Sequence, residues 1–333
     1  MHRKAWIEVK TRTRQKWTER AMLLTALATC HCGPRHCVVQ RNLLLSYRPI
    51  IGVLAQENRS EDEFAQGSSY IAASYIKYLE GAGARVAPIR MGLKDKEYVR
   101  LFYSINGLLL PGGDIDLRTS NSNRVARIFY RLALKANNTK DYFPIWGICQ
   151  GFQQLSFFTA NKYLLTQTNT KGVALPLNFT QEAQSSRLFQ SLPSDVMQCL
   201  AKENITSNFH NYSLSMQNYT ENPKLRMFYR ILSTNIDEGV EFISTMEGYR
   251  YPFYALQWHP EKCPYEWVDK PGMVHTTSAT RTCFYTASFF VSEAMKNSHR
   301  FSCPKEEEKA LIYNYPPFFT SMDAIFIQNY YFD

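Results

Sequence analysis

Residues 144–158 read PIWGICQGFQQLSFF. The apolar run Pro144–Ile148 predicts a short buried strand, and Phe152–Phe158 predict the start of a helix. Between the two stands the pattern Gly-x-Cys-x-Gly, with Cys149 at its centre. A strand that turns directly into a helix around such a residue is the thiol counterpart of the serine nucleophile elbow.

This position has a chemical consequence for Cys149. The flanking Gly147 and Gly151 let a strand and a helix approach closely. The start of the helix points amide donors and the positive end of its dipole at the sulfur, which favours the thiolate, the form that attacks. The alternative is a buried, inert cysteine between two packing glycines. The pattern favours the nucleophile.

The neighbouring segments repeat this alternation of strand and helix. We expect strands at Ile50–Gln56, Arg85–Ile89, Gly107–Leu110 and Pro144–Ile148. We expect helices at Ser68–Glu80, Lys94–Ser104 and Val125–Ala136, and a further helix that opens with Phe152–Phe158. Such alternation predicts an α/β fold with a doubly wound, mostly parallel sheet and helices on both faces. In such sheets the chemistry gathers at the carboxyl ends of the strands.

The second half of the chain has a different pattern. Strand-like segments are expected at Phe228–Thr234, Glu241–Met246 and Tyr254–Trp258, followed by a helix over Thr280–Asn297. The aromatic, proline-containing tail Glu306–Asp333 is expected to wrap over the surface. Residues 49–333 are therefore predicted to form a single domain with an extended C-terminal tail, and residues 1–48 a leader that is removed or disordered.

Two further motifs follow predicted strands. In QWHPEK, Pro260 favours an extended backbone at His259, so His259 and Glu261 can lie on one face, where a carboxylate orients an imidazole. The alternative is a structural histidine. In PGGD, Gly112 and Gly113 allow a backbone amide to face a ligand and to form an oxyanion hole with the amide of Gln150; the alternative is a plain turn.

Composition excludes several classes of protein. With 45% hydrophobic and 20% charged residues, the 333-residue chain can bury a full core, and no apolar run is long enough to span a bilayer. The formal charge is +9, but residues 1–48 hold ten lysines and arginines against two acids. The remaining residues are nearly neutral, which argues against nucleic acid as a partner.

The leader resembles a secretory signal. Basic residues fill positions 3–20, and the short apolar stretch Ala21–Ala28 is followed by small residues. A mitochondrial presequence and a wrongly assigned first exon, with Met22 as the true start, are the alternatives. Cys32 and Cys37 with nearby histidines match no common zinc spacing, and we expect no metal site.

Candidate N-glycosylation sites support export. Three of the six lie within residues 204–220. We expect a secreted or lysosomal glycoprotein, with mitochondria as the alternative. The six asparagines of the Asn-x-Ser/Thr pattern are Asn58, Asn137, Asn178, Asn204, Asn211 and Asn218.

Longer blocks of sequence resemble one family. They include RPIIGVLAQE (48–57), INGLLLPGGD (105–114), YFPIWGICQGFQQLS (142–156), SNFHNYSLS (207–215) and EFISTMEGYRYPFYALQWHPEK (241–262). Together they resemble the γ-glutamyl hydrolase (folate polyglutamate hydrolase) family of the class I glutamine-amidotransferase-like superfamily. The resemblance runs from about Pro49 to the C-terminus and implies a flavodoxin-like sheet and a homodimer.

The resemblance implies roles for individual residues. The family's nucleophile falls on Cys149, its catalytic histidine on His259 and the acid that orients it on Glu261. His210 matches a further active-site histidine, and Gly113 is the candidate for the oxyanion loop.

The chain departs from the family at two positions. Family members commonly carry Leu at the position of Gln150 and Glu at the position of Gln153. Gln150 should cost little if only its amide is used. Gln153 removes a negative charge near the pocket, which puts the pH profile and substrate handling in doubt.

The implied activity is cysteine-dependent hydrolysis of γ-glutamyl bonds in folyl- and antifolyl-poly-γ-glutamates, through a thioester and with no metal or organic cofactor. Because this small-molecule substrate is a polyanion, some basic residues should line the cleft. The alternatives are a glutaminase subunit of an amidotransferase and a catalytically weak folate-binding relative.

Overall fold

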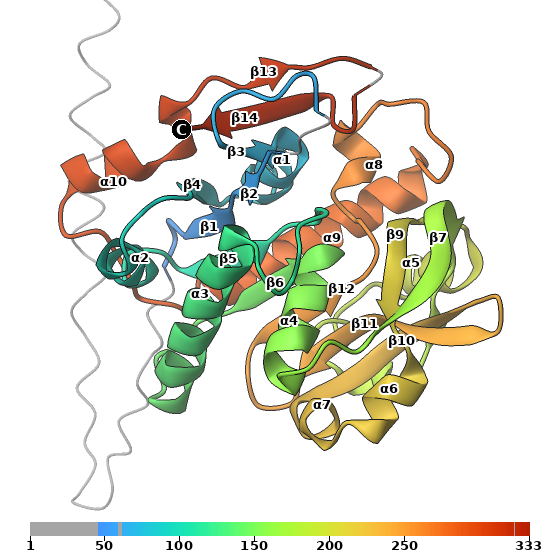
Figure 1. The fold of residues 1–333 in the computed structure, drawn as a ribbon. Coiled ribbons are helices and arrows are strands. Elements are labelled where there is room, and N and C mark those ends of the chain that lie inside the picture. The colour runs from blue at the N-terminus through green and yellow to red at the C-terminus, as the bar shows by residue number, and fades with distance from the viewer. Residues whose placement is uncertain (1–45, 59–61, 323) are drawn as a thin grey trace, which may run out of the picture. The chain divides into compact units, whose positions relative to one another are not determined.

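An eight-stranded sheet forms the centre of the structure (Figure 1). The computed structural model describes residues 46–58, 62–322 and 324–333, all within one compact unit. Five neighbouring strands of the sheet run parallel. Across the sheet they are β4 (Arg85–Ile89), β1 (Ile50–Leu54), β5 (Gly107–Leu110), β6 (Ile145–Ile148) and β12 (Phe253–Leu256).

Three antiparallel strands extend the sheet beyond β12. They are β11 (Val240–Gly248), β10 (Tyr229–Asp237) and β8 (Asn178–Phe179). When the five parallel strands alone are numbered along the chain, they follow the order 2-1-3-4-5 of flavodoxin-like sheets. The predicted fold class is therefore confirmed. The parallel strands are almost completely buried, as a sheet covered on both faces requires.

Two groups of helices cover the sheet. α1 (Ala73–Glu80) packs against α9 (Thr277–Ala294), whereas α3 (Asn121–Asn138) contacts both α2 (Asp95–Phe102) and α4 (Gln150–Ala160). In Figure 1, α3 and α4 lie in front of the sheet and α9 behind it. Side chains of Ser120 and Thr276 accept hydrogen bonds from backbone amides at the starts of α3 and α9, which explains where both helices begin.

A second sheet corrects two predictions. It has the order β13 (Phe318–Phe319), β14 (Gln328–Phe332), β3 (Ser69–Ala72) and β2 (Gln56–Glu57). The predicted helix Ser68–Glu80 is wrong at its start, because residues 69–72 pair with the end of the chain as a strand. The tail is not only a surface wrapping, since it supplies two strands of this sheet (Figure 1).

A third sheet pairs β7 (Leu165–Leu175) with β9 (Thr206–Leu214), and its register shifts twice along β7. No such pair of strands was predicted. The shorter helices are α5 (Ser194–Lys202), α6 (Met216–Glu221), α7 (Pro223–Phe228), α8 (Lys262–Tyr265) and α10 (Pro304–Ala310), with 3-10 turns η1 (Ala183–Ser185) and η2 (Ile312–Asn314).

Most other predicted boundaries lie close to the observed ones. β4 and β5 have the predicted limits. The helix predicted at Thr280–Asn297 is observed as α9, and both of its ends lie three residues earlier in the chain than predicted. Residues 1–45, which contain most of the predicted leader and its cysteines, lie outside the described residues. Among the described helices, none combines the length and the hydrophobicity that a bilayer crossing needs.

Candidate active site

Cys149 occupies a strained turn between β6 and α4. Its backbone has φ 52° and ψ −104°, a conformation that non-glycine residues rarely adopt. A methyl group on Gly151 would lie 2.1 Å from the carbonyl oxygen of Leu110, and one on Gly147 would lie 2.7 Å from the backbone of Gly151. Both glycines are therefore required by close contact between strand and helix, as the predicted elbow demands.

His259 and Glu261 form a buried pair just beyond the end of β12. The His259 amide donates to the carbonyl of Ser207 in β9 (2.9 Å), and ring atom Nδ1 lies 2.7 Å from Glu261 Oε1. Glu261 is wholly buried and His259 is 5% exposed. Because Nδ1 faces the carboxylate, Nε2 is the ring nitrogen left to serve a reacting group.

The elbow and the pair meet at one point. A methyl group on Gly112 would lie 2.6 Å from His259 Cε1, 2.8 Å from the Tyr75 hydroxyl and 3.2 Å from Cys149 Cβ. The Cys149 sulfur is also close enough to the imidazole to contribute to the raised pKa of His259. Residues from four separate segments are thus brought together at the carboxyl ends of β5, β6 and β12.

Electrostatic interactions favour a proton on His259. Burial lowers the pKa of its ring, but Glu261 and Cys149 more than offset this effect and raise the pKa to about 9. Burial would raise the pKa of Glu261, but the charge and hydrogen bond of His259, with a contribution from Lys262, lower it. The pair can therefore hold the proton that leaves a thiol.

Of the two glycine amides in the predicted oxyanion loop, only that of Gly113 makes no hydrogen bond to a described residue. The amide of Gly112 donates to the Tyr75 hydroxyl at 2.8 Å. No hydrogen bond to a described residue occupies the amide of Gly113. The side chain of Gln150 holds the loop, donating to the carbonyl of Ile115 (2.7 Å) and accepting from its amide (3.1 Å). The Gln150 amide opens α4, where helical amides have no intrahelical partner.

Tyr75 was missed by sequence reasoning. Burial, together with the charges of Glu261 and Cys149, raises the pKa of its hydroxyl well above the usual value, so the group stays neutral. Its only signal in the sequence was a place on the apolar face of a predicted helix, which is where structural tyrosines also lie.

His210 and Gln153 lie in the pocket wall. The His210 ring contacts Thr170 Oγ1 (2.8 Å), Asn208 Oδ1 (3.0 Å) and Ser213 Oγ (3.1 Å). Burial, and secondarily the charge of His259, lower the pKa of His210 to about 3, so this ring is neutral. Gln153 donates through Nε2 to the carbonyl of Tyr212 (2.8 Å), a bond that a carboxylate could not make.

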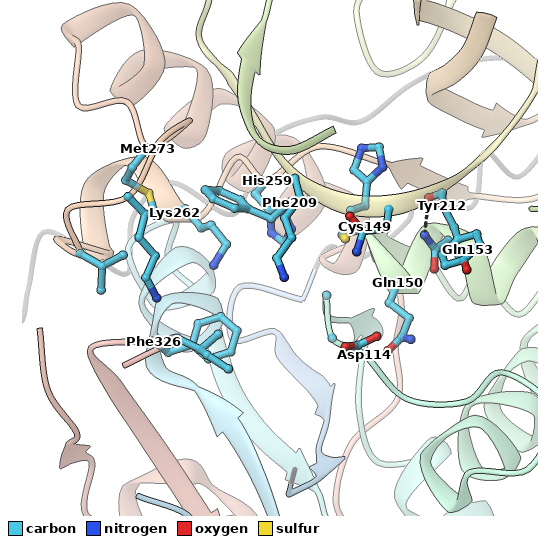
Figure 2. A pocket seen from close by; sticks show the side chains of 18 residues that line it. Asp114, Cys149, Gln150, Gln153, Phe209, Tyr212, His259, Lys262, Met273 and Phe326 are labelled. Atoms are coloured by element: carbon cyan, nitrogen blue, oxygen red, sulfur yellow. Dashed lines mark hydrogen bonds between the residues drawn. The ribbon is translucent and has the colours of Figure 1, made fainter. Parts of the chain in front are cut away.

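A cavity of about 370 Å³ opens onto Cys149. Figure 2 shows Cys149 between two ends, with Gln153 and Tyr212 at one and Lys262, Met273 and Phe326 at the other. The pocket-lining residues are Gly112, Gly113, Asp114, Cys149, Gln150, Gln153, Lys171, Phe209, His210, Asn211, Tyr212, His259, Lys262, Val268, Lys270, Met273, Ile325 and Phe326.

The expected basic residues are present in this cavity as Lys171, Lys262 and Lys270. Lys262 directly follows Glu261 in the QWHPEK motif, which is the one signal that could have found it. Lys171 lies in β7 and Lys270 in the loop after α8, elements whose proximity no local pattern indicates.

The candidate glycosylation sites fall into two groups. Asn178, Asn204 and Asn211 are exposed, and Asn211 lines the pocket. In the other three, the amide nitrogen donates two hydrogen bonds to nearby oxygens; these are Asn58, Asn137 and Asn218.

Comparison with known proteins places the chain in a family. The model of the Peptidase C26 family matches residues 49–261. The chain belongs to this family. It is 52% identical to human γ-glutamyl hydrolase over 312 residues, 93% of this chain and 98% of that protein. It is 38% identical to γ-glutamyl hydrolase B of Dictyostelium discoideum, over 86% of this chain and 83% of that one.

The family resemblance predicted from the sequence is thus confirmed, and this member of the Peptidase C26 family is a hydrolase. Among solved structures, PurLQS from Thermotoga maritima aligns with a TM-score of 0.45 and 14% identity, over 74% of this chain and 97% of that one.

Replacing Gly151 with alanine should disrupt the elbow. The added methyl group would lie 2.1 Å from the Leu110 carbonyl oxygen, so strand and helix must move apart. We expect a loss of about 1–3 kcal/mol in the free energy of unfolding and a loss of hydrolase activity. Urea denaturation and activity of Gly151→Ala measure both; wild-type values for this variant would contradict the crowding described above.

Replacing Glu261 with glutamine should lower the pKa of His259. The variant removes the negative charge that raises this pKa. Burial, which lowers the pKa of His259, is then no longer offset by the Glu261 carboxylate. In the wild type, the protonated ring stabilises the fold fully below about pH 6.5. This contribution is lost as the pH rises from there to about 9.

NMR titration of labelled histidine rings measures this pKa, with the His259 signal assigned from a His259→Gln sample. The stability difference between wild type and Glu261→Gln should also shrink over the same pH range. An unchanged pKa in Glu261→Gln would show that the carboxylate does not govern the ring.

Proposed function

We propose that the chain hydrolyses γ-glutamyl peptide bonds in poly-γ-glutamyl folates and antifolates. In this proposal Cys149 is the nucleophile, His259 the general acid and base, and Glu261 the residue that orients His259. One observation carries the proposal: the strained Cys149 meets the buried His259–Glu261 pair at the floor of a cavity that also holds three lysines. The names of the relatives support the choice of bond.

The chemistry follows from this arrangement. The proton of the Cys149 thiol passes to His259, and the sulfur attacks the γ-carbonyl carbon. The amides of Gly113 and Gln150 are placed to hold the oxyanion, since the Gly112 amide is bonded to Tyr75. Collapse of the tetrahedral intermediate breaks the C–N bond as His259 protonates the leaving amine, leaving a thioester on Cys149.

Water then completes the reaction. His259 removes a proton from a water molecule, which attacks the thioester carbonyl, and the same proton returns to the departing sulfur. The products are a γ-carboxylate and the regenerated thiol. Throughout, Glu261 remains ionised and stabilises the protonated ring, consistent with its lowered pKa.

Replacing Cys149 with alanine should abolish turnover, because no other described residue offers a nucleophile at the elbow. We expect a loss of several orders of magnitude in kcat. The assay incubates wild type, Cys149→Ala and the exposed-cysteine control Cys303→Ala with folate pentaglutamate and, separately, with free glutamine. Chromatography follows glutamate, γ-linked oligoglutamate and ammonia.

The two substrates separate the proposal from its alternatives. Release of glutamate or γ-linked oligoglutamate by wild type and Cys303→Ala supports the proposal. Ammonia from glutamine alone would indicate a glutaminase, and no turnover by wild type at acidic or neutral pH under reducing conditions would indicate a binding protein. A mass increase on wild type after acid quenching, absent from Cys149→Ala, would identify the thioester.

We also propose that the chain is exported and glycosylated, and that it forms a homodimer. Support for export comes from the basic and apolar order of the leader and from three exposed sequons without side-chain hydrogen bonds to described residues, at Asn178, Asn204 and Asn211. The homodimer rests on family resemblance, and light scattering of the purified protein tests it.

Expression of the full chain in animal cells should place it in the medium or in lysosomes with N-glycans. Peptide-N-glycosidase should increase its gel mobility, and Asn204→Gln should remove one glycan. A chain lacking residues 1–29 should stay in the cytosol without glycans. Recovery of the full chain from mitochondria without glycans would overturn the proposal of export.

A further inference from the structure

Lys262 is an unusual cation because it is buried without a carboxylate partner. The side chain is 5% exposed, and its ammonium nitrogen lies 4.4 Å from the ring centroid of Phe326 and 5.4 Å from that of Phe209. No carboxylate of a described residue forms an ion pair with it. Glu261 is near enough for its pKa to be lowered by Lys262, but its hydrogen-bonded oxygen faces His259.

Such a cation is costly unless something compensates it. An ammonium withdrawn from water loses hydration, and two aromatic faces restore only part of that energy. Lys262 also lines the cavity, so a ligand can reach its nitrogen. These observations indicate that an anionic group completes the charge balance of this end of the pocket.

Neighbouring residues add to the positive character of the same wall. Lys171 is exposed beside a register shift in β7, and it makes no ion pair with a described residue. Lys270 donates to the carbonyl of Ala324 at 2.8 Å. Among the described residues that line the pocket, the one carboxylate is Asp114, which lies near Gln150 and away from Lys262 (Figure 2).

The position of His259 indicates which part of a substrate reaches Lys262. Figure 2 shows His259 between Cys149 and Lys262, with Gln153 on the far side of Cys149. The leaving amine must approach His259 to be protonated, so the leaving portion extends toward Lys262 and the acyl portion toward Gln153. In a γ-linked glutamate chain, the carbon that bears the leaving amine also bears the α-carboxylate.

We propose that Lys262, assisted by Lys171, forms a subsite for the α-carboxylate of the leaving glutamate. This inference rests on the proposed function and adds the group that selects the leaving portion. Lys262 is then a specificity-determining residue: it distinguishes an amine that carries a neighbouring carboxylate from one that does not.

The test compares two substrates that differ only in this carboxylate. One is a folate diglutamate, and in the other the terminal glutamate is replaced by 4-aminobutyrate, which keeps the amine and the distal carboxylate. Wild type should prefer the diglutamate in kcat/KM. A charge-assisted hydrogen bond is worth about 1.5–3 kcal/mol, so Lys262→Met should reduce this preference roughly ten- to hundredfold.

Three variants control for other effects. Lys135→Met removes a charge from the exposed face of α3 and should keep the wild-type preference. Lys262→Arg keeps the positive charge and should retain much of the preference for the diglutamate. Lys171→Met should reduce it less than Lys262→Met does. A wild-type preference in Lys262→Met, or in Lys262→Gln if the methionine variant does not fold, would overturn the subsite.

A binding measurement separates this inference from the proposed function. Calorimetry of γ-linked triglutamate is performed on Cys149→Ala and on Cys149→Ala/Lys262→Met, neither of which needs to turn over substrate. Weaker binding to the double variant supports the subsite even if wild type proves inactive on folates. Equal binding to both proteins would overturn the subsite even if wild type hydrolyses the folate substrates.

Discussion

The close contact between α4 and the end of β5 is the constraint on which the site depends. Gly151 lies against the Leu110 carbonyl, so α4 can start only where the chain turns sharply at Cys149. Parallel pairing then aligns the neighbouring strands, with Leu110 opposite Gly147 and Leu256 opposite Ile148. The pairing of these strands therefore brings the glycine loop after β5 and the histidine after β12 close to the sulfur.

The groups around His259 differ in their protonation states. Glu261 keeps a proton on the ring, His210 stays neutral in its hydrogen-bonded surroundings, and Tyr75 stays neutral beside the thiol. This arrangement confines the mobile proton to one imidazole. A neutral Gln153 in the pocket wall fits this arrangement. A carboxylate at this position would add a negative charge to the pocket and could not donate the hydrogen bond to the Tyr212 carbonyl.

Sequence reasoning found the parts of the structure that local patterns encode. Short apolar runs between turn residues predicted the observed limits of β4 and β5. Motifs at the ends of strands predicted Cys149, His259 and Glu261 as site residues. It missed β3 because Tyr70 and Ile71 fit a helical period, whereas their partner strand lies some 260 positions later. Lys171 and Phe326 were missed for the same reason, since only tertiary packing brings them to the pocket.

The reacting groups and the pocket walls come from different parts of the fold. The reacting groups stand at the ends of strands of the central sheet, but most of the pocket wall comes from β7, β9, the loop after α8 and the segment between β13 and β14. Gly172 and Gly272 lie so close together that a methyl group on Gly272 would lie 2.5 Å from the Gly172 backbone, so β7 lies directly against the loop that carries Lys270. Changes in these walls can therefore alter the leaving group that is accepted while the strained turn at Cys149 stays as it is.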